Sequence, residues 1–241
     1  MTGLSLAAER PAAKSSPQEA VALRPSEYTA ALIDALRTRP GLVRGATVLE
    51  IGSGSGVVLA AAAALGAAEL CGVDIEESAV ATGAVLLHGM GHGDHVELLR
   101  GDMWRPVGGR RFDLILANLP QFPMERRFCQ DRLPSWSAGG TDGRQVMDRF
   151  LTGLADHLTA CGRTVITHNA FIDLERSRSI ARAHGLSLRS LATLLVHIPP
   201  EKFELMTGGI RVAEEGRSIH RYGPHAFAEM HVAELRRSLE D

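Results

Sequence analysis

The chain of 241 residues has three cysteines, and these show no metal-ligand spacing. An odd number without such spacing argues against a disulfide framework and favours reduced thiols in a cytoplasm. The sequence also lacks the roughly eighteen consecutive apolar residues that a membrane-spanning helix needs. Its N-terminus does not show the charged and then apolar order of a secretion signal. We therefore expect a cytoplasmic protein with no membrane partner and leave its oligomeric state open.

An excess of charge of one sign is also missing. The 26 lysine and arginine residues and the 28 acidic residues leave a formal net charge of −2. The chain therefore has no overall positive charge that would favour nucleic acid as a partner. Only two of the basic residues are lysines, Lys14 and Lys202, which we interpret as a bias of genome composition. The length suffices for one compact domain with a sizeable core.

A glycine-rich turn comes after the first expected strand, in the sequence VLEIGSGSG at 48–56. Glycines with this spacing let a backbone pass close to a ligand. The alanine-rich segment 57–65 predicts a helix whose first amide groups are free to donate. The turn alone is a weak signal, and its specificity comes from the expected strands downstream.

Three further expected strands each end in polar residues. Residues 69–75 carry Asp74 about twenty positions after the glycines, where a carboxylate can bind a ribose diol. Residues 96–104 end with Asp102 and large side chains, where an adenine ring can lie. Residues 112–117 precede the polar segment 118–121. We expect these strand ends to converge in a nucleoside-binding crevice.

This ordered set, at 44–170, resembles the class I S-adenosylmethionine-dependent methyltransferases. The resemblance implies an α/β fold with a doubly wound, mainly parallel seven-stranded sheet, and S-adenosylmethionine as cofactor. It implies that the glycine motif holds the methionine end, Asp74 the ribose, and Asp102 with Met103 the adenine. The cofactor-binding residues that it indicates are Glu50, Gly52, Ser53, Gly54, Gly56, Asp74, Ile75, Asp102, Met103 and Asn118.

The alternative cofactor is a nicotinamide dinucleotide, since its fingerprint also has glycines, a helix start and a ribose acid. Here the glycines fall as G-x-G-x-G, and Val57 stands where the dinucleotide pattern needs its last glycine. The dehydrogenase interpretation also gives no reason for Asp102 or for the segment 118–121. We therefore prefer the methyltransferase.

Within that superfamily, Asn-Leu-Pro-Gln at 118–121 and Gly-Gly-Thr-Asp-Gly-Arg at 139–144 resemble the release-factor glutamine methyltransferase group. That group and the amino-directed nucleic-acid methyltransferases carry Asn-Pro-Pro-aromatic after the fourth strand. There the asparagine side chain and a neighbouring carbonyl accept hydrogen bonds from the target nitrogen. The resemblance implies a catalytic segment of Asn118, Leu119, Pro120 and Gln121.

The segment departs from that pattern at two positions. Leu119 replaces the first proline, and Gln121 replaces the aromatic ring, which would contribute about 1–3 kcal/mol by stacking in nucleic-acid sites. Gln121 offers a donor and an acceptor, which suits a polar small molecule. Only about 45 residues precede the first strand, and the N-terminal helical domain of release-factor enzymes is not seen.

We therefore expect methyl transfer to an amide or amine nitrogen of a small molecule, rather than of a protein. Three alternatives stay open. The first is a protein glutamine N-methyltransferase of the release-factor type, and the second is an O- or C-methyltransferase. The third, of a different class, is a protein that binds S-adenosylmethionine without catalysis.

The rest of the chain gives coarser expectations. We divide it into an N-terminal arm and helix, 1–43, and a methyltransferase domain, 44–241; the helix, at 28–36, either roofs the site or packs on the sheet. Helices are expected at 76–90, 145–158 and 174–184, and strands at 163–169, 191–198, 203–205 and 226–232.

The irregular segment 122–138 is expected to be functional. Further candidates for substrate contacts are His168, Asn169, Arg126, Arg127, Arg132, Glu201, Phe203 and Glu204. No metal site is expected, because His88, His92 and His95 lack a completing ligand.

Overall fold

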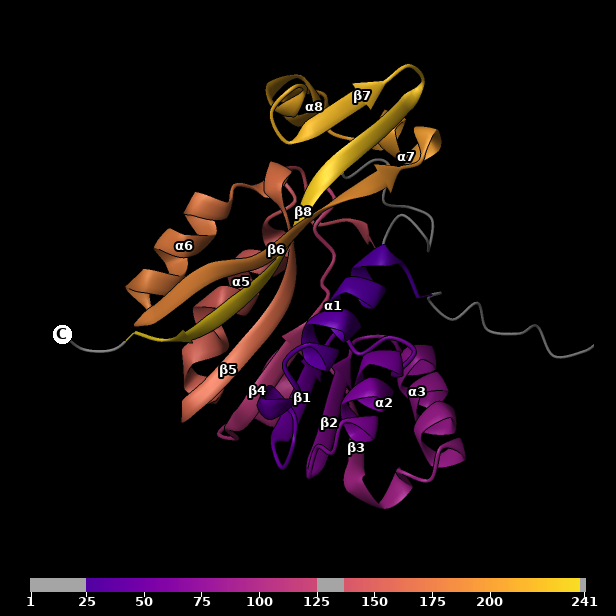
Figure 1. Ribbon diagram of the computed structural model, residues 1–241, viewed down its shortest axis with the longest axis vertical. Helices are drawn as coiled ribbons and strands as arrows, with labels where there is room; N and C mark the ends of the chain where they lie inside the picture. The colour runs from indigo at the N-terminus through magenta and orange to yellow at the C-terminus, as the bar shows by residue number, and fades with distance from the viewer. Residues whose placement is uncertain (1–24, 125–136, 239–241) are drawn as a thin grey trace, which may run out of the picture.

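The computed structural model describes residues 25–124 and 137–238 (Figure 1). The arm at 1–24 and the candidates Arg126, Arg127 and Arg132 lie outside these ranges. The described strands form one sheet in the order β3-β2-β1-β4-β5-β8-β6, with β7 paired to β8. Their bounds are β1 Thr47–Ile51, β2 Glu69–Asp74, β3 Val96–Arg100, β4 Phe112–Ala117, β5 Leu158–Asn169, β6 Leu186–Ile198, β7 Ile219–Tyr222 and β8 His225–Arg237.

The first five strands pair in parallel, whereas β8 runs antiparallel between β5 and β6. The expected doubly wound, mainly parallel α/β sheet is therefore confirmed. The expected number of seven strands is wrong, since the sheet has eight. The added strand, β7, folds back on β8 through a turn at Gly223, whose φ is +61°. Strand β7 pairs with the first residues of β8.

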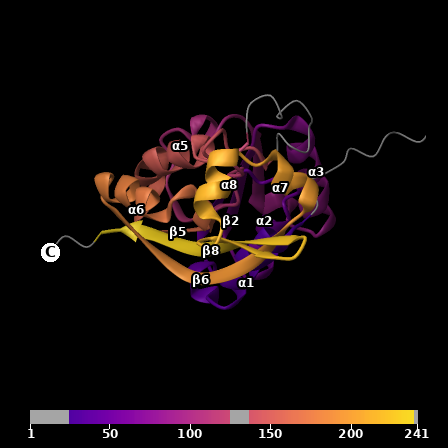
Figure 2. The same ribbon diagram turned by 90° about the horizontal axis from the view of Figure 1, so that it is seen from above.

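Helices cover both faces of the sheet. Apolar residues of α1 and α2 form one core with the face of β1, β4 and β5, and α5 and α6 contribute to a second core on the other face. Figure 2 shows α1 on one side of β6 and β8, with α5 and α6 on the other. The helix bounds are α1 Glu27–Arg37, α2 Val57–Ala64, α3 Glu77–Gly89, α5 Gln145–Leu154, α6 Leu174–Ala183, α7 Pro200–Leu205 and α8 Gly208–Glu214.

Helix α1 packs on the face of the sheet beside α2, with Leu32 and Leu36 fully buried. A capping box at Ser26 and Thr29 starts the helix. Its first turn also reaches the carboxyl edge of the sheet, because the Tyr28 hydroxyl donates a 2.6 Å hydrogen bond to Asn169 Oδ1 at the end of β5. The helix is thus part of the core and touches the edge where the strand ends meet.

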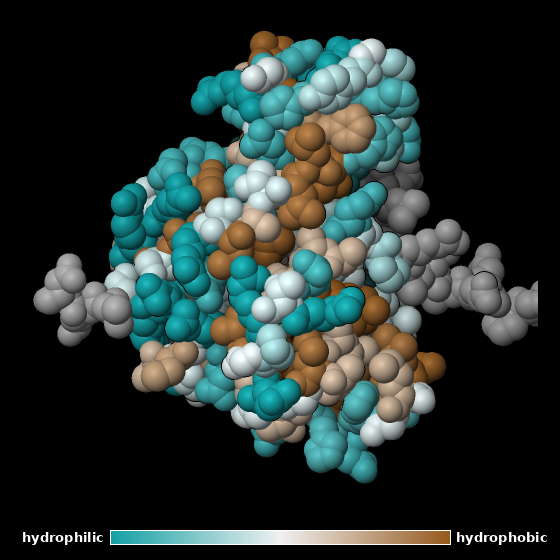
Figure 3. Space-filling view, in the orientation of Figure 1, coloured by the Kyte–Doolittle hydropathy of each residue, from teal (hydrophilic) through white to brown (hydrophobic). Residues whose placement is uncertain are grey.

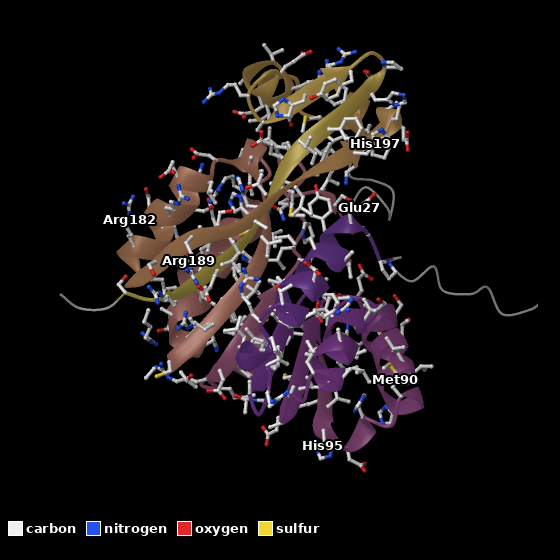
Figure 4. The ribbon with its side chains drawn as sticks, in the orientation of Figure 1. Glu27, Met90, His95, Arg182, Arg189 and His197 are labelled. Atoms are coloured by element: carbon white, nitrogen blue, oxygen red, sulfur yellow. The ribbon has the colours of Figure 1, made fainter. Side chains whose placement is uncertain are left out.

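Residues 203–205, expected as a strand, belong to helix α7. This expectation is wrong because Pro200 lies in the first turn of the segment, where its fixed φ favours a helix. The residues of α7 and just after it pack on the loop after β4: Thr207 N donates to Pro123 O at 2.9 Å, and the Lys202 ammonium lies 4.7 Å from the Phe122 ring centroid. Figure 4 shows Glu27, in the first turn of α1, below His197, which lies near the end of β6.

The surface has mixed polarity. In the space-filling view, apolar residues lie along the middle of one face, and hydrophilic side chains cover the region of α6 (Figure 3). Leu194 and Leu195 of β6 are exposed. None of the helices within 25–124 and 137–238 combines the length and hydropathy that a membrane crossing needs.

The loop at 139–144 packs tightly against the segment after β4. Gly139 N donates to Phe122 O, and Met124 N donates to Gly140 O. Gly143 has a φ of +74°, and a Cβ atom placed there would lie 2.6 Å from Gln121 O and 2.5 Å from Ile172 Cγ2. Glycine is therefore needed at 143 for both its backbone conformation and the close approach.

A buried guanidinium joins this loop to the start of α6. Arg144 forms an ion pair with Asp148 and donates to Ile172 O, to Asp173 O at 3.0 Å and to Ser177 Oγ at 2.9 Å. The Ser177 hydroxyl in turn bonds His168 Nε2 at 2.7 Å. Burial, and then the charge of Arg144, lower the pKa of the fully buried His168 to about 3.

We predict that Gly143→Ala destabilises the fold more than Gly109→Ala. Gly109 has a similar φ of +76° but no atom within 4 Å of an added Cβ, so it reports the conformational cost alone, about 1–2 kcal/mol. Overpacking at Gly143 should add about 1–3 kcal/mol. Urea unfolding of both variants measures the difference. Equal losses would show that the loop absorbs the new methyl group.

We also predict a pH dependence of stability that comes from His168. The unfolded imidazole has a pKa of about 6.5, so protons favour the unfolded state below that pH. Stability should be complete above pH 6.5 and fall as the pH decreases toward 3. In this window wild type should lose about 1.4 kcal/mol per pH unit more than His168→Gln.

The control for this experiment is Ser177→Ala, which removes the hydroxyl partner of His168 and keeps the imidazole. It should lower stability at every pH while keeping the slope of wild type. Urea titrations between pH 4 and 7 give all three slopes. A His168→Gln slope equal to that of wild type would mean that His168 is protonated in the folded protein.

Candidate functional site

A cavity of about 350 Å³ opens at the carboxyl edge of the parallel strands, where the predicted polar residues meet. Because these strands run in the same direction, the loops after β1, β2, β3 and β4 gather at one edge. Its lining residues are Ile51, Gly52, Gly54, Ser55, Val73, Asp74, Ile75, Glu76, Ser78, Ala79, Gly101, Asp102, Met103, Asn118, Leu119, Pro120, Ala138, Val146 and Arg149.

The glycine turn forms the floor of this cavity. Gly52, Gly54 and Gly56 have φ values of +74°, +52° and +77°, which side chains rarely allow. Gly52 and Gly54 line the cavity, whereas Ser53 and Gly56 lie outside its lining. Gly56 serves the packing of two helices, since a Cβ there would lie 3.0 Å from Gly83 Cα in α3.

The Asp74 carboxylate lies beside the turn and orders it. Its Oδ2 accepts from Gly54 N at 2.8 Å, and its Oδ1 accepts from Glu76 N at 2.9 Å. Each carboxylate oxygen can accept a second hydrogen bond. Asp74 therefore fixes the loop and still offers acceptors to a ligand in the cavity, and the exposed Ile75 adds apolar surface next to it.

Glu50 lies beneath the glycine turn, outside the cavity lining, and is 2 % exposed. Its Oε2 has no hydrogen-bond partner among the described residues. Burial, together with the smaller effect of the negative charge of Asp74, raises the pKa of Glu50 well above its usual range. An unpaired buried carboxyl beneath a cradle of glycines fits a cofactor that carries positive charge, as S-adenosylmethionine does.

Asp102 and Met103 form another wall. Met103 is buried with a φ of +55°, a strained conformation for a side chain of this size that is most frequent at functional sites. Asp102 Oδ2 accepts from Arg149 Nη2 at 2.7 Å. Arg149 comes from α5 and lines the cavity; it lies 47 residues from Asp102 along the chain, and no motif in the sequence indicates it.

The segment after β4 forms part of the cavity wall. Asn118, Leu119 and Pro120 line it. The buried Gln121 does not: its Oε1 accepts from Asn169 N at 2.7 Å and its Nε2 donates to Thr167 O at 3.1 Å. The Gln121 amide is thus bonded within the protein rather than turned to the cavity.

The remaining candidates lie away from the cavity lining. His168 bonds Ser177 and Asn169 bonds Tyr28, so their side chains are used between elements of the fold. Phe203 is buried in α7, and Glu201 and Glu204 are exposed on that helix. Figure 4 places His95 at the edge of the sheet opposite the loop after β4. Among the described residues, no group of three or more histidine, cysteine and acidic side chains is arranged to hold a metal.

Comparison with known proteins identifies the family. Residues 28–126 match the model of the ribosomal protein L11 methyltransferase family. A Methanocaldococcus jannaschii protein, named as a candidate protein N5-glutamine methyltransferase, is 30% identical over 157 residues, which cover 64% of this chain and 77% of that protein. The release factor glutamine methyltransferase of Gloeobacter violaceus is 30% identical over 148 residues, 58% of this chain and 51% of the enzyme.

A solved structure shows the same fold. The ribosomal protein L11 methylase of Lactobacillus delbrueckii superposes with a TM-score of 0.54 at 16% identity, over 87% of this chain and 80% of that one. This chain thus aligns with about half of the Gloeobacter enzyme and with most of the archaeal protein.

The expectation of a small-molecule acceptor is wrong. It relied on Leu119 and Gln121 and on the short segment before β1, whereas the matching relatives are named for methylation of proteins. The loss of the aromatic ring at 121 is no evidence about the size of the acceptor, because that position is buried and points away from the cavity.

The family and the cavity agree on the cofactor, which is S-adenosylmethionine. The chain belongs to the class I S-adenosylmethionine-dependent methyltransferases, in the family of its Methanocaldococcus jannaschii relative.

Proposed function

We propose that this enzyme methylates the side-chain amide nitrogen of a glutamine in a protein. One observation carries the proposal: Asn118, Leu119 and Pro120 line the same cavity as Gly52, Asp74 and Asp102. An acceptor at the loop after β4 would therefore lie next to a cofactor bound along the other strand ends. The names of the relatives support glutamine as the target and protein as the class of substrate.

For the cofactor, we assign the glycine turn to the methionine end and Asp74 and Ile75 to the ribose. Asp102 and Met103 are assigned to the adenine. S-adenosylmethionine supplies an electrophilic methyl group on a positively charged sulfur. The Glu50 carboxyl lies beneath the glycine turn, where ionisation would balance that positive charge. We assign these residues to binding and orienting the cofactor.

For the acceptor, methyl transfer requires that the lone pair of the target amide nitrogen be directed toward the methyl group. An amide nitrogen is a weak nucleophile because its lone pair is delocalised into the carbonyl group. Asn118 Oδ1 and Leu119 O are two oxygens that can accept its two hydrogens, which would hold the lone pair toward the methyl group. Positioning of this kind supplies a large part of the rate of such reactions.

The cofactor assignment predicts that Asp74→Ala weakens binding of S-adenosylmethionine. Two charge-assisted hydrogen bonds to a ribose would be lost, each worth about 1.5–3 kcal/mol, so the dissociation constant should rise at least tenfold. Isothermal titration calorimetry measures it. An unchanged constant would remove Asp74 from the site, and binding of NADH in place of S-adenosylmethionine would contradict the whole assignment.

Asp113→Ala is the matched control for this titration. Asp113 Oδ2 accepts from Thr47 N at 3.1 Å and from Thr47 Oγ1 at 2.9 Å, at the amino edge of the sheet. The substitution removes a carboxylate that also bonds the backbone but does not line the cavity. Its affinity for S-adenosylmethionine should equal that of wild type.

The acceptor assignment predicts activity on glutamine peptides that depends on Asn118. With methyl-labelled S-adenosylmethionine and a panel of glutamine-containing peptides and translation proteins, label should appear on glutamine nitrogen. Asn118→Ala should lower kcat by about 10²-fold, the usual cost of one lost electrostatic contact in a transition state. The affinity for S-adenosylmethionine should stay within about twofold, since this change leaves the other strand ends intact.

Three results would contradict this assignment. Equal losses of binding and turnover in Asn118→Ala would make the residue a structural one. Label on oxygen or carbon, or binding of S-adenosylmethionine without turnover on any protein acceptor, would favour the alternatives that the sequence left open. A peptide with glutamate in place of glutamine is the substrate control and should stay unlabelled.

A further inference from the structure

The two oxygens assigned to binding the acceptor, Asn118 Oδ1 and Leu119 O, each accept a hydrogen bond from a side chain that does not line the cavity. The Thr167 hydroxyl donates to Asn118 Oδ1 at 2.7 Å, and Gln121 Nε2 lies 3.4 Å from Leu119 O. The same Gln121 nitrogen donates to Thr167 O at 3.1 Å. The Thr167 side chain thus bonds Asn118 Oδ1 directly, and the Thr167 carbonyl is joined to Leu119 O through Gln121 Nε2. Thr167 does not line the cavity.

The pairing of two strands places Thr167 beside Asn118. In the parallel register of β4 and β5, Ala117 lies opposite Ile166, so the next residues of both strands are neighbours. Thr167 is fully buried. A threonine in a strand has a stiff χ1 angle because its Cβ is branched, so the direction of the hydroxyl is set by the strand.

The hydrogen bond decides which end of the Asn118 amide faces the acceptor. The terminal torsion of asparagine is broad and nearly twofold, so the amide group alone is free to present its oxygen or its NH₂. With the NH₂ group turned to Thr167, the buried hydroxyl hydrogen would lose Asn118 Oδ1, the acceptor that the structure gives it. A buried donor without a partner costs about 1–3 kcal/mol.

We propose that Thr167 is a positioning residue for methyl transfer, which holds Asn118 Oδ1 toward the target nitrogen. This inference rests on the proposed function. A carbonyl oxygen has two acceptor positions; Thr167 occupies one and directs the other to the amide hydrogen of the substrate. Thr167 itself touches neither the cofactor nor the acceptor, since it is absent from the cavity lining.

The variants Thr167→Val and Thr167→Ser test this role. Valine keeps the shape of threonine and lacks the hydroxyl, so kcat on a glutamine substrate should fall about tenfold, with the dissociation constant of S-adenosylmethionine unchanged within about twofold. Serine restores the hydroxyl and should recover kcat to within about threefold of wild type. A purely structural role would change stability and leave kcat of the folded enzyme as it was.

The matched control is Thr164→Val on the same strand. Thr164 is also fully buried, and its Oγ1 has no hydrogen-bond partner among the described residues. The same chemical change there removes a hydroxyl group that makes no hydrogen bond to the described residues, so kcat should equal that of wild type. A loss of kcat in Thr164→Val as large as in Thr167→Val would overturn the inference.

A second measurement separates this inference from the proposed function. The ¹⁵N relaxation of the Asn118 side-chain NH₂ group, identified by its absence in Asn118→Asp, reports whether the amide is held. Its order should drop in Thr167→Val and recover in Thr167→Ser. Wild-type inactivity on every glutamine substrate would contradict the proposed function, whereas unchanged relaxation in Thr167→Val would overturn the positioning role whatever the acceptor is.

Discussion

The parallel pairing of β4 with β5 is the constraint on which the side of the cavity formed by Asn118, Leu119 and Pro120 depends. It brings the segment at 118–121 beside Thr167 and Asn169, so that the Gln121 amide can bond the backbone of β5 at two points. The loop at 139–144 then fits around Gln121 without room for a side chain at Gly143. Two segments, the end of β5 and the loop at 139–144, thereby pack against this one short loop.

The buried polar groups around the start of α6 are arranged so that few charges stay uncompensated. Arg144 is paired with Asp148 and caps backbone carbonyls, while His168 stays neutral because burial lowers its pKa. The buried Glu50 carboxyl has an oxygen that lacks a hydrogen-bond partner in the described structure. A buried acid of this kind is costly for the protein alone, which is consistent with a site that is completed by a positively charged ligand.

The sequence predicted the parts of this structure that depend on local patterns. The glycine turn, Asp74, Asp102 and the helix after 144 all lie where periodicity and motif order placed them. It missed features that depend on partners distant in the sequence: Arg149 at the cavity, Thr167 behind Asn118, and the inward turn of Gln121. Short apolar runs such as 203–205 do not distinguish strand from helix, and a proline decided that case.

The sheet is completed only by β8, which comes after all the other described strands in chain order. This strand, at His225–Arg237, lies between β5 and β6 and pairs with both along most of their length. During synthesis, the edges of β5 and β6 that pair with β8 therefore stay open until residues 225–237 have been made. Unpaired edges of this kind are prone to pair with other chains. Strands β1 to β4 all lie before residue 118 and are free of this delay.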